Sequence, residues 1–61
     1  MNHTEKQYID AGYQYERAKT PDGGRARAEI IRSMLDKENP KDKPEARALI
    51  ERGRAEARGH A

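Results

Sequence analysis

Large apolar side chains are scarce in this chain and are confined to three short stretches. Its 61 residues include no Phe, Trp, Val or Cys. A domain of this length buries only about 60% of the surface that its unfolded chain exposes. After Met1, the large apolar residues are Tyr8, Ile9, Tyr13, Tyr15, Ile30, Ile31, Met34, Leu35, Leu49 and Ile50. So few groups barely offset the entropy lost on ordering, and we expect one small domain, residues 1–61, at the edge of independent stability.

A chain of this size usually needs a further source of stability, such as a disulfide, a metal ion or a second protein surface. The absence of Cys excludes a disulfide. The only histidines, His3 and His60, lie near the two ends, which argues against a structural zinc site. The sequence therefore predicts no cofactor and no metal, and it favours a homodimer or a complex with another protein.

Charged residues make up 39% of the chain, with thirteen basic and eleven acidic groups whose signs are interleaved. The excess of +2 lies in residues 41–61, and so small an imbalance is weak support for nucleic-acid binding.

No apolar stretch is long enough to span a membrane and no signal peptide is visible, so a cytoplasmic protein is expected. Abundant Arg, Ala and Gly favour a bacterial or phage origin.

The first helix is predicted over residues 4–19. Thr4 and Gln7 have the spacing of a capping box, in which each side chain accepts a hydrogen bond from the backbone of the other residue. On a period of 3.6 residues, one face collects the apolar and small side chains. These are Tyr8, Ala11, Gly12, Tyr15 and Ala18.

The second helix is predicted over residues 23–38, after a turn that contains Pro21. Either Thr20 or Asp22 can cap it, and Pro40 limits its end because the residue before a proline avoids the helical region. Its apolar ridge is expected to form the core or a self-association surface. The ridge consists of Ile30, Ile31, Met34 and Leu35.

The third helix is predicted over residues 43–58, with Asp42 as its N-cap. Its narrow apolar stripe consists of Ala46, Leu49, Ile50, Gly53 and Ala57. The fold class is therefore all-α: a small bundle of two to three amphipathic helices, arranged as a helical hairpin plus a third helix and forming a dimer.

Two glycines lie in the middle of predicted helices, although each costs about 1 kcal/mol relative to alanine. Gly12 is on the apolar face of the first helix and Gly53 is on that of the third. We interpret them as the place where these two helices approach closely, or where one of the faces meets its copy in a dimer.

Three arginines on the third helix are the strongest candidates for partner binding. Arg47, Arg54 and Arg58 project in similar directions, and the planar guanidinium group suits carboxylates and phosphates. The alternative is a solvated face, because Arg47–Glu51 and Arg52–Glu56 have the spacing of ordinary helix-stabilising pairs.

On the first helix, Tyr13 lies off the apolar face, so we predict partial exposure. Exposed tyrosine is enriched at protein interfaces, and Arg17 follows one turn later. Tyr13 and Arg17 are therefore added to the predicted partner-binding residues.

Catalytic constellations are not visible in the sequence. Ser33 has no histidine near it in sequence, and the carboxylates alternate with arginines, a pattern unlike that of a general acid–base site. We therefore expect a small non-enzymatic module, such as an adaptor, inhibitor or regulator, that binds a protein partner through a helix face. The alternative is a DNA-binding regulator that uses its basic third helix, although the proline-interrupted linker before that helix is unlike the short turn of a helix-turn-helix.

Overall fold

A computed structural model describes residues 1–59, in which helix α1 spans Glu5–Arg17. His60 lies outside the described residues. The predicted capping box is present: the Gln7 amide donates to Thr4 Oγ1 over 3.1 Å, and the Thr4 amide donates to Gln7 Oε1 over 2.8 Å. The helix ends two residues before the predicted position 19, because Ala18 leaves the helical region with ψ of 128°.

Helix α2 spans Pro21–Asp36 and begins two residues earlier than predicted. Thr20 is its N-cap and accepts a hydrogen bond of 3.0 Å from the Gly23 amide. Pro21 follows at the first helical position, where the missing amide hydrogen has no cost. At the other end, the Glu38 amide bonds to the Leu35 carbonyl over 3.0 Å, so the helix closes before the predicted residue 38.

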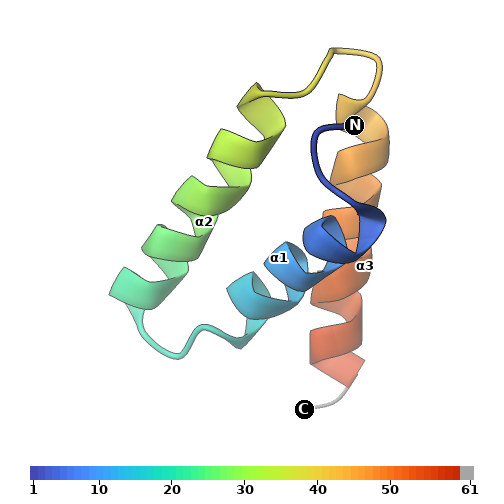
Figure 1. Ribbon diagram of the computed structural model, residues 1–61. Coiled ribbons are helices and arrows are strands. Elements are labelled where there is room, and N and C mark those ends of the chain that lie inside the picture. Colours follow the sequence, from blue (N-terminus) through green and yellow to red (C-terminus); the bar gives the residue numbers. More distant parts are fainter. Residues whose placement is uncertain (60–61) are drawn as a thin grey trace.

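Helix α3 spans Lys43–Gly59, close to the predicted residues 43–58. Within residues 1–59 the structure is all-helical, and the three helices form a small bundle (Figure 1). Successive helices run in opposite directions, so α1 and α3 run the same way with α2 beside them. None of the described helices combines the length and the apolar character that crossing a membrane requires.

The α1–α3 contact is a direct approach of two backbones. A methyl group built on Gly12 would lie 1.9 Å from the Ile50 carbonyl oxygen, and one on Gly53 would lie 1.8 Å from the Ile9 carbonyl oxygen. Neither position has room for any side chain. The prediction that these glycines mark a close approach of the first and third helices is confirmed.

The core is small and belongs almost entirely to this helix pair. Tyr8 is fully buried, and Ala46 and Ile50 surround it from α3. By contrast, α2 has no buried residue, and it contacts α1 more than it contacts α3. It rests on the core through Ile31, Met34 and Leu35, which are each only partly buried.

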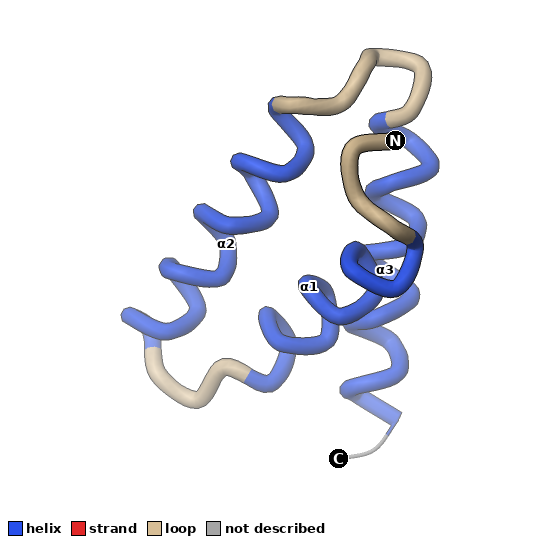
Figure 2. The backbone as a smooth tube through the Cα atoms, viewed as in Figure 1, coloured by secondary structure: helices blue, strands red, loops and turns tan. Residues whose placement is uncertain are grey.

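The N-terminal segment lies beside the connection between α2 and α3 (Figure 2). The N-terminal amine is 4.0 Å from an Asp42 carboxylate oxygen, and the Asn2 amide donates to Glu38 over 2.8 Å. The Cα radius of gyration is 11.1 Å, near the value of about 10.5 Å expected for a folded chain of this length. The bundle is therefore compact although α2 is only lightly attached.

Alanine scanning of the glycines tests this contact. We expect Gly53→Ala to lower the free energy of unfolding by roughly 1–3 kcal/mol, because the new methyl group forces α1 and α3 apart. The matched control is Gly24→Ala, where no atom lies within 4 Å of the new methyl group. That variant should gain about 0.5–1 kcal/mol from helix propensity. Urea denaturation followed by circular dichroism measures both, and equal gains in the two variants would contradict the close contact.

Candidate functional site

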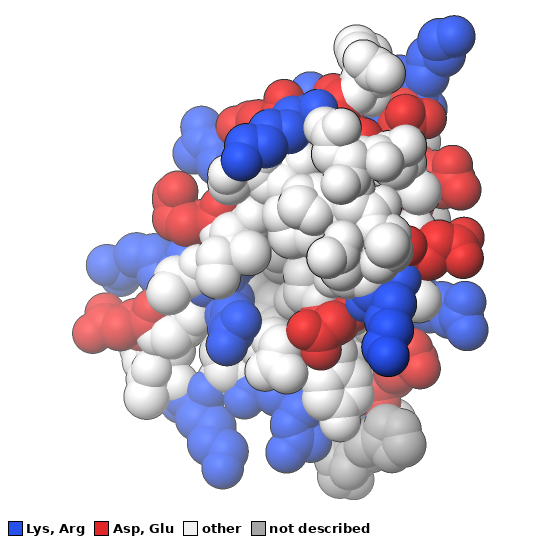
Figure 3. Space-filling model, in the orientation of Figure 1, with Lys and Arg blue, Asp and Glu red and all other residues white. Residues whose placement is uncertain are grey.

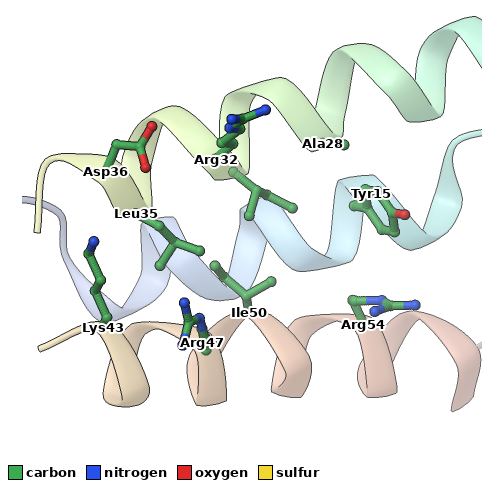
Figure 4. Close-up of a pocket in the computed structure, with 10 residues that line it drawn as sticks. Tyr15, Ala28, Arg32, Leu35, Asp36, Lys43, Arg47, Ile50 and Arg54 are labelled. Carbon is green, nitrogen blue, oxygen red and sulfur yellow. The ribbon is translucent and has the colours of Figure 1, made fainter. Parts of the chain in front are cut away.

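A groove of about 390 Å³ runs between α2 and α3, with α1 behind it (Figure 4). Apolar groups form its interior: Leu35 and Ile31 come from α2, Ile50 from α3 and Tyr15 from α1. The groove exists because α2 and α3 make few direct contacts with each other and both pack against α1. Its complete lining is Tyr15, Ala28, Ile31, Arg32, Leu35, Asp36, Lys43, Arg47, Ile50 and Arg54.

The charged side chains of the groove are mostly basic. Lys43 and Arg47 project from α3, and Arg32 projects from α2, where Asp36 is the only carboxylate of the lining. Within residues 1–59, none of the three basic groups takes part in an ion pair. An apolar groove with free cations along it can hold a segment that is apolar on one side and acidic at its edges.

Arg54 and Arg58, which we expected to bind a partner, contact carboxylates of their own chain. Arg54 Nε lies 2.9 Å from Glu16 Oε1, and an Arg58 nitrogen lies 3.1 Å from the same oxygen. Both arginines also pair with Glu51, at 3.5 and 3.0 Å. The hydrogen bond to Glu16 raises the pKa of Arg54, whose guanidinium group also lies over the Tyr15 ring, 5.0 Å from its centroid. This network joins α1 to α3, and the partner-binding role of both arginines stays a prediction.

Of the remaining predicted residues, Tyr13 and Arg17 contact each other, and Arg47 lies apart from Tyr13. Tyr13 is half-buried, and the Arg17 guanidinium lies 5.7 Å from its ring centroid. Tyr13 lines a separate shallow hollow with Ile9 and Glu56, away from the groove where Arg47 lies. Arg17 and Arg58 line a further hollow with Glu16, and Arg47 and Arg54 both line the groove, so the structure brings the predicted partner-binding residues together in pairs.

The predicted apolar ridge of α2 is divided between two sides of the helix. Ile31 and Leu35 line the groove, and together with Met34 they also pack against the core. Ile30 is 45% exposed and does not line the groove. Of the four residues, Ile30 is thus the most available for self-association.

A buried polar contact that the sequence analysis missed joins Tyr8 to Glu38. The Tyr8 hydroxyl donates to the Glu38 carboxylate, which is only 6% exposed although it follows the last turn of α2. The Asn2 amide donates to the same carboxylate, and the Asn2 side chain donates to the Lys37 carbonyl. The two residues are thirty positions apart in the sequence. Neither residue type nor local spacing distinguishes Glu38 from the other acidic residues, so nothing in the sequence indicated this contact.

The same contact shifts two pKa values in opposite directions. Burial, followed by the hydrogen bond to Glu38, raises the pKa of Tyr8 from 10.0 to about 12. The hydrogen bond from Tyr8 is the main cause that lowers the pKa of Glu38. Nowhere in residues 1–59 do three or more His, Cys, Asp or Glu side chains gather so that they could hold a metal ion.

The pH dependence of stability tests the Tyr8–Glu38 contact. A phenol whose pKa is raised by folding stabilises the folded chain below pH 10, and this contribution is lost as the pH rises from 10 to about 12. We expect Tyr8→Phe to lower stability by roughly 1–3 kcal/mol at pH 7, because a buried acceptor loses its donor. It should also remove the alkaline loss that the wild type shows. Thermal denaturation at several pH values measures both, with Tyr15→Phe, which keeps the ring beside Arg54, as the control.

Comparison of the chain with protein-family models, with curated proteins and with solved structures gives no match. The groove, the exposed part of α2 and the charges around them are therefore the indications of function that this chain offers.

Proposed function

We propose that the chain is a small non-enzymatic protein–protein interaction module, of the adaptor, inhibitor or regulator type, that binds its partner through α2 and the adjoining groove. The observation that supports this proposal is the poor burial of α2 in the bundle. A helix of 16 residues has no buried side chain and leaves Ile31 and Leu35 along an open groove. Partner binding would cover these side chains and stabilise α2 on the bundle.

Blocking the groove tests the proposal. A library of random helical peptides displayed on phage would be selected against the immobilised chain. We expect the selected peptides to bind Ala28→Trp at least about tenfold more weakly, because the indole fills a groove lined by Ala28. Ala55→Trp is the matched control, since Ala55 is also an exposed helical alanine but does not line the groove. Equal loss in both variants, or no selected peptide at all, would contradict the proposal.

A homodimer is a second candidate, which the exposure of Ile30 favours. Ile30 is the most exposed large apolar side chain of the three helices, at 45%. It lies on a different side of α2 from the residues that line the groove, so a dimer formed there would leave the groove open. Self-association and partner binding are therefore compatible in this fold.

Sedimentation velocity at two concentrations tests the dimer. We expect the wild-type chain to sediment faster at the higher concentration, and Ile30→Ser to sediment as a monomer at both, because burial of the isoleucine supplies roughly 1.5–3 kcal/mol. Ala48→Ser, at an exposed position of α3, serves as the control. A wild-type chain that sediments as a monomer at both concentrations would exclude the dimer.

DNA binding is the less favoured alternative. Two of the arginines on α3 that would contact phosphates, Arg54 and Arg58, already pair with Glu16 and Glu51. On the face seen in Figure 3, Asp and Glu side chains lie among the Lys and Arg side chains around most of the margin, and Lys and Arg side chains lie next to one another only along the lower edge, so no broad basic area covers this face. Duplex binding depends on such an area.

A further inference from the structure

We propose that the α2–α3 groove binds an acidic amphipathic helix of a partner protein. The apolar side of that helix would lie between α2 and α3, and its carboxylates would lie on the basic rim of the groove, which consists of Arg32, Lys43 and Arg47. This inference rests on the proposed interaction function and adds the chemistry of the partner. Three features of the groove support it: its shape, its charge, and the poor fit of this chain's own helices.

The shape suits one helix. The walls of the groove are α2 and α3, which have 16 and 17 residues, and α1 closes the back (Figure 4). Helices of this length extend about 24–26 Å, so a partner helix of several turns can lie along them. Helix-in-groove recognition uses apolar side chains at i, i+3, i+4 and i+7. Ile31 and Leu35, which are only partly buried, offer the apolar surface on which such side chains pack, and the buried Ile50 lies beneath it.

The charge selects an acidic partner. Arg32, Lys43 and Arg47 belong to the groove lining and form no ion pair within residues 1–59, whereas Arg54 is already paired with Glu16 and Glu51. Asp36 is the one opposing carboxylate among the lining residues. Glutamates on both edges of a bound helix would therefore meet two or three free cations. Such complementary charges accelerate encounter and fix the register of the complex.

A second copy of the chain fits this groove poorly. Helix α2 carries three basic and three acidic side chains, and α3 carries five basic and three acidic ones, so neither has the acidic character that the rim requires. Helix α1 is slightly acidic, but its apolar face is occupied by the contact with α3. The occupant is therefore a helix of a different protein.

Three synthetic helices test the inference on the full chain. They share one apolar face and about 16 residues, and carry Glu, Gln or Lys on both flanks of that face. Isothermal titration calorimetry gives the affinities, and amide chemical shifts of the labelled chain locate the binding site. We expect the Glu peptide to bind at the groove residues at least about threefold more tightly than the Gln peptide, and the Lys peptide to bind most weakly. The preference for Glu should shrink as salt is raised from about 50 to 500 mM.

A matched pair of charge reversals assigns the effect to the rim. Arg47→Glu should weaken binding of the Glu peptide and improve that of the Lys peptide. Arg52→Glu makes the same change at an exposed α3 position outside the groove lining, and it should leave the order of affinities unchanged. Circular dichroism confirms that both variants are folded.

The possible failures are distinct. Equal affinities for the three peptides at the groove would overturn the acidic partner but leave the proposed interaction function intact. If no peptide shifts the groove resonances while the library selection also yields no binder, both proposals fail. Concentration-dependent shifts at the groove without peptide would assign it to a second copy, and salt-sensitive binding of duplex DNA by Arg32 and Arg47 would assign it to nucleic acid. Either result overturns the inference.

Discussion

The arrangement of this protein depends on the contact between the backbones of α1 and α3 at Gly12 and Gly53. The chain has too few large apolar side chains to fill the space between three helices, and it removes much of that space instead. Each glycine admits a carbonyl group of the opposite helix where a methyl group would clash. The dispersion energy gained by two closely packed backbones thus takes the place of side-chain volume, and Tyr8 needs only Ala46 and Ile50 around it to be buried.

The same contact determines where the groove lies. Helices α1 and α3 pack directly against each other at the glycines, and the ion pairs of Glu16 with Arg54 and Arg58 also join them. Helix α2 packs against another side of the α1–α3 pair, where it contacts α1 more than α3. Its apolar side chains therefore pack against the core on one side and border an open space between α2 and α3 on the other. In the proposed function, a partner helix would cover this open space.

The local features of the fold could be predicted from the sequence, and the long-range contacts could not. Thr4, Thr20 and Pro21 act within a few residues, so the starts of α1 and α2 follow from capping rules, although the second helix begins two residues earlier than expected. The glycine contact was predictable because a helical glycine on an apolar face needs a reason. The ion pair of Glu16 with Arg54 and the buried contact of Tyr8 with Glu38 join residues thirty or more positions apart, and helical periodicity carries no information on such pairs. The groove itself is a consequence of tertiary packing and had no signal in the sequence.

The light attachment of α2 also affects how the bundle opens. Amide hydrogens exchange with solvent when the helix that protects them detaches, and units with few buried contacts detach at low free energy. Helix α2 has no buried side chain, whereas α1 and α3 share the core and the glycine contact. The amides of α2 should therefore exchange as one group, well before those of the α1–α3 pair. A bound partner would slow exchange along α2 first, so the least protected helix becomes the most sensitive reporter of recognition.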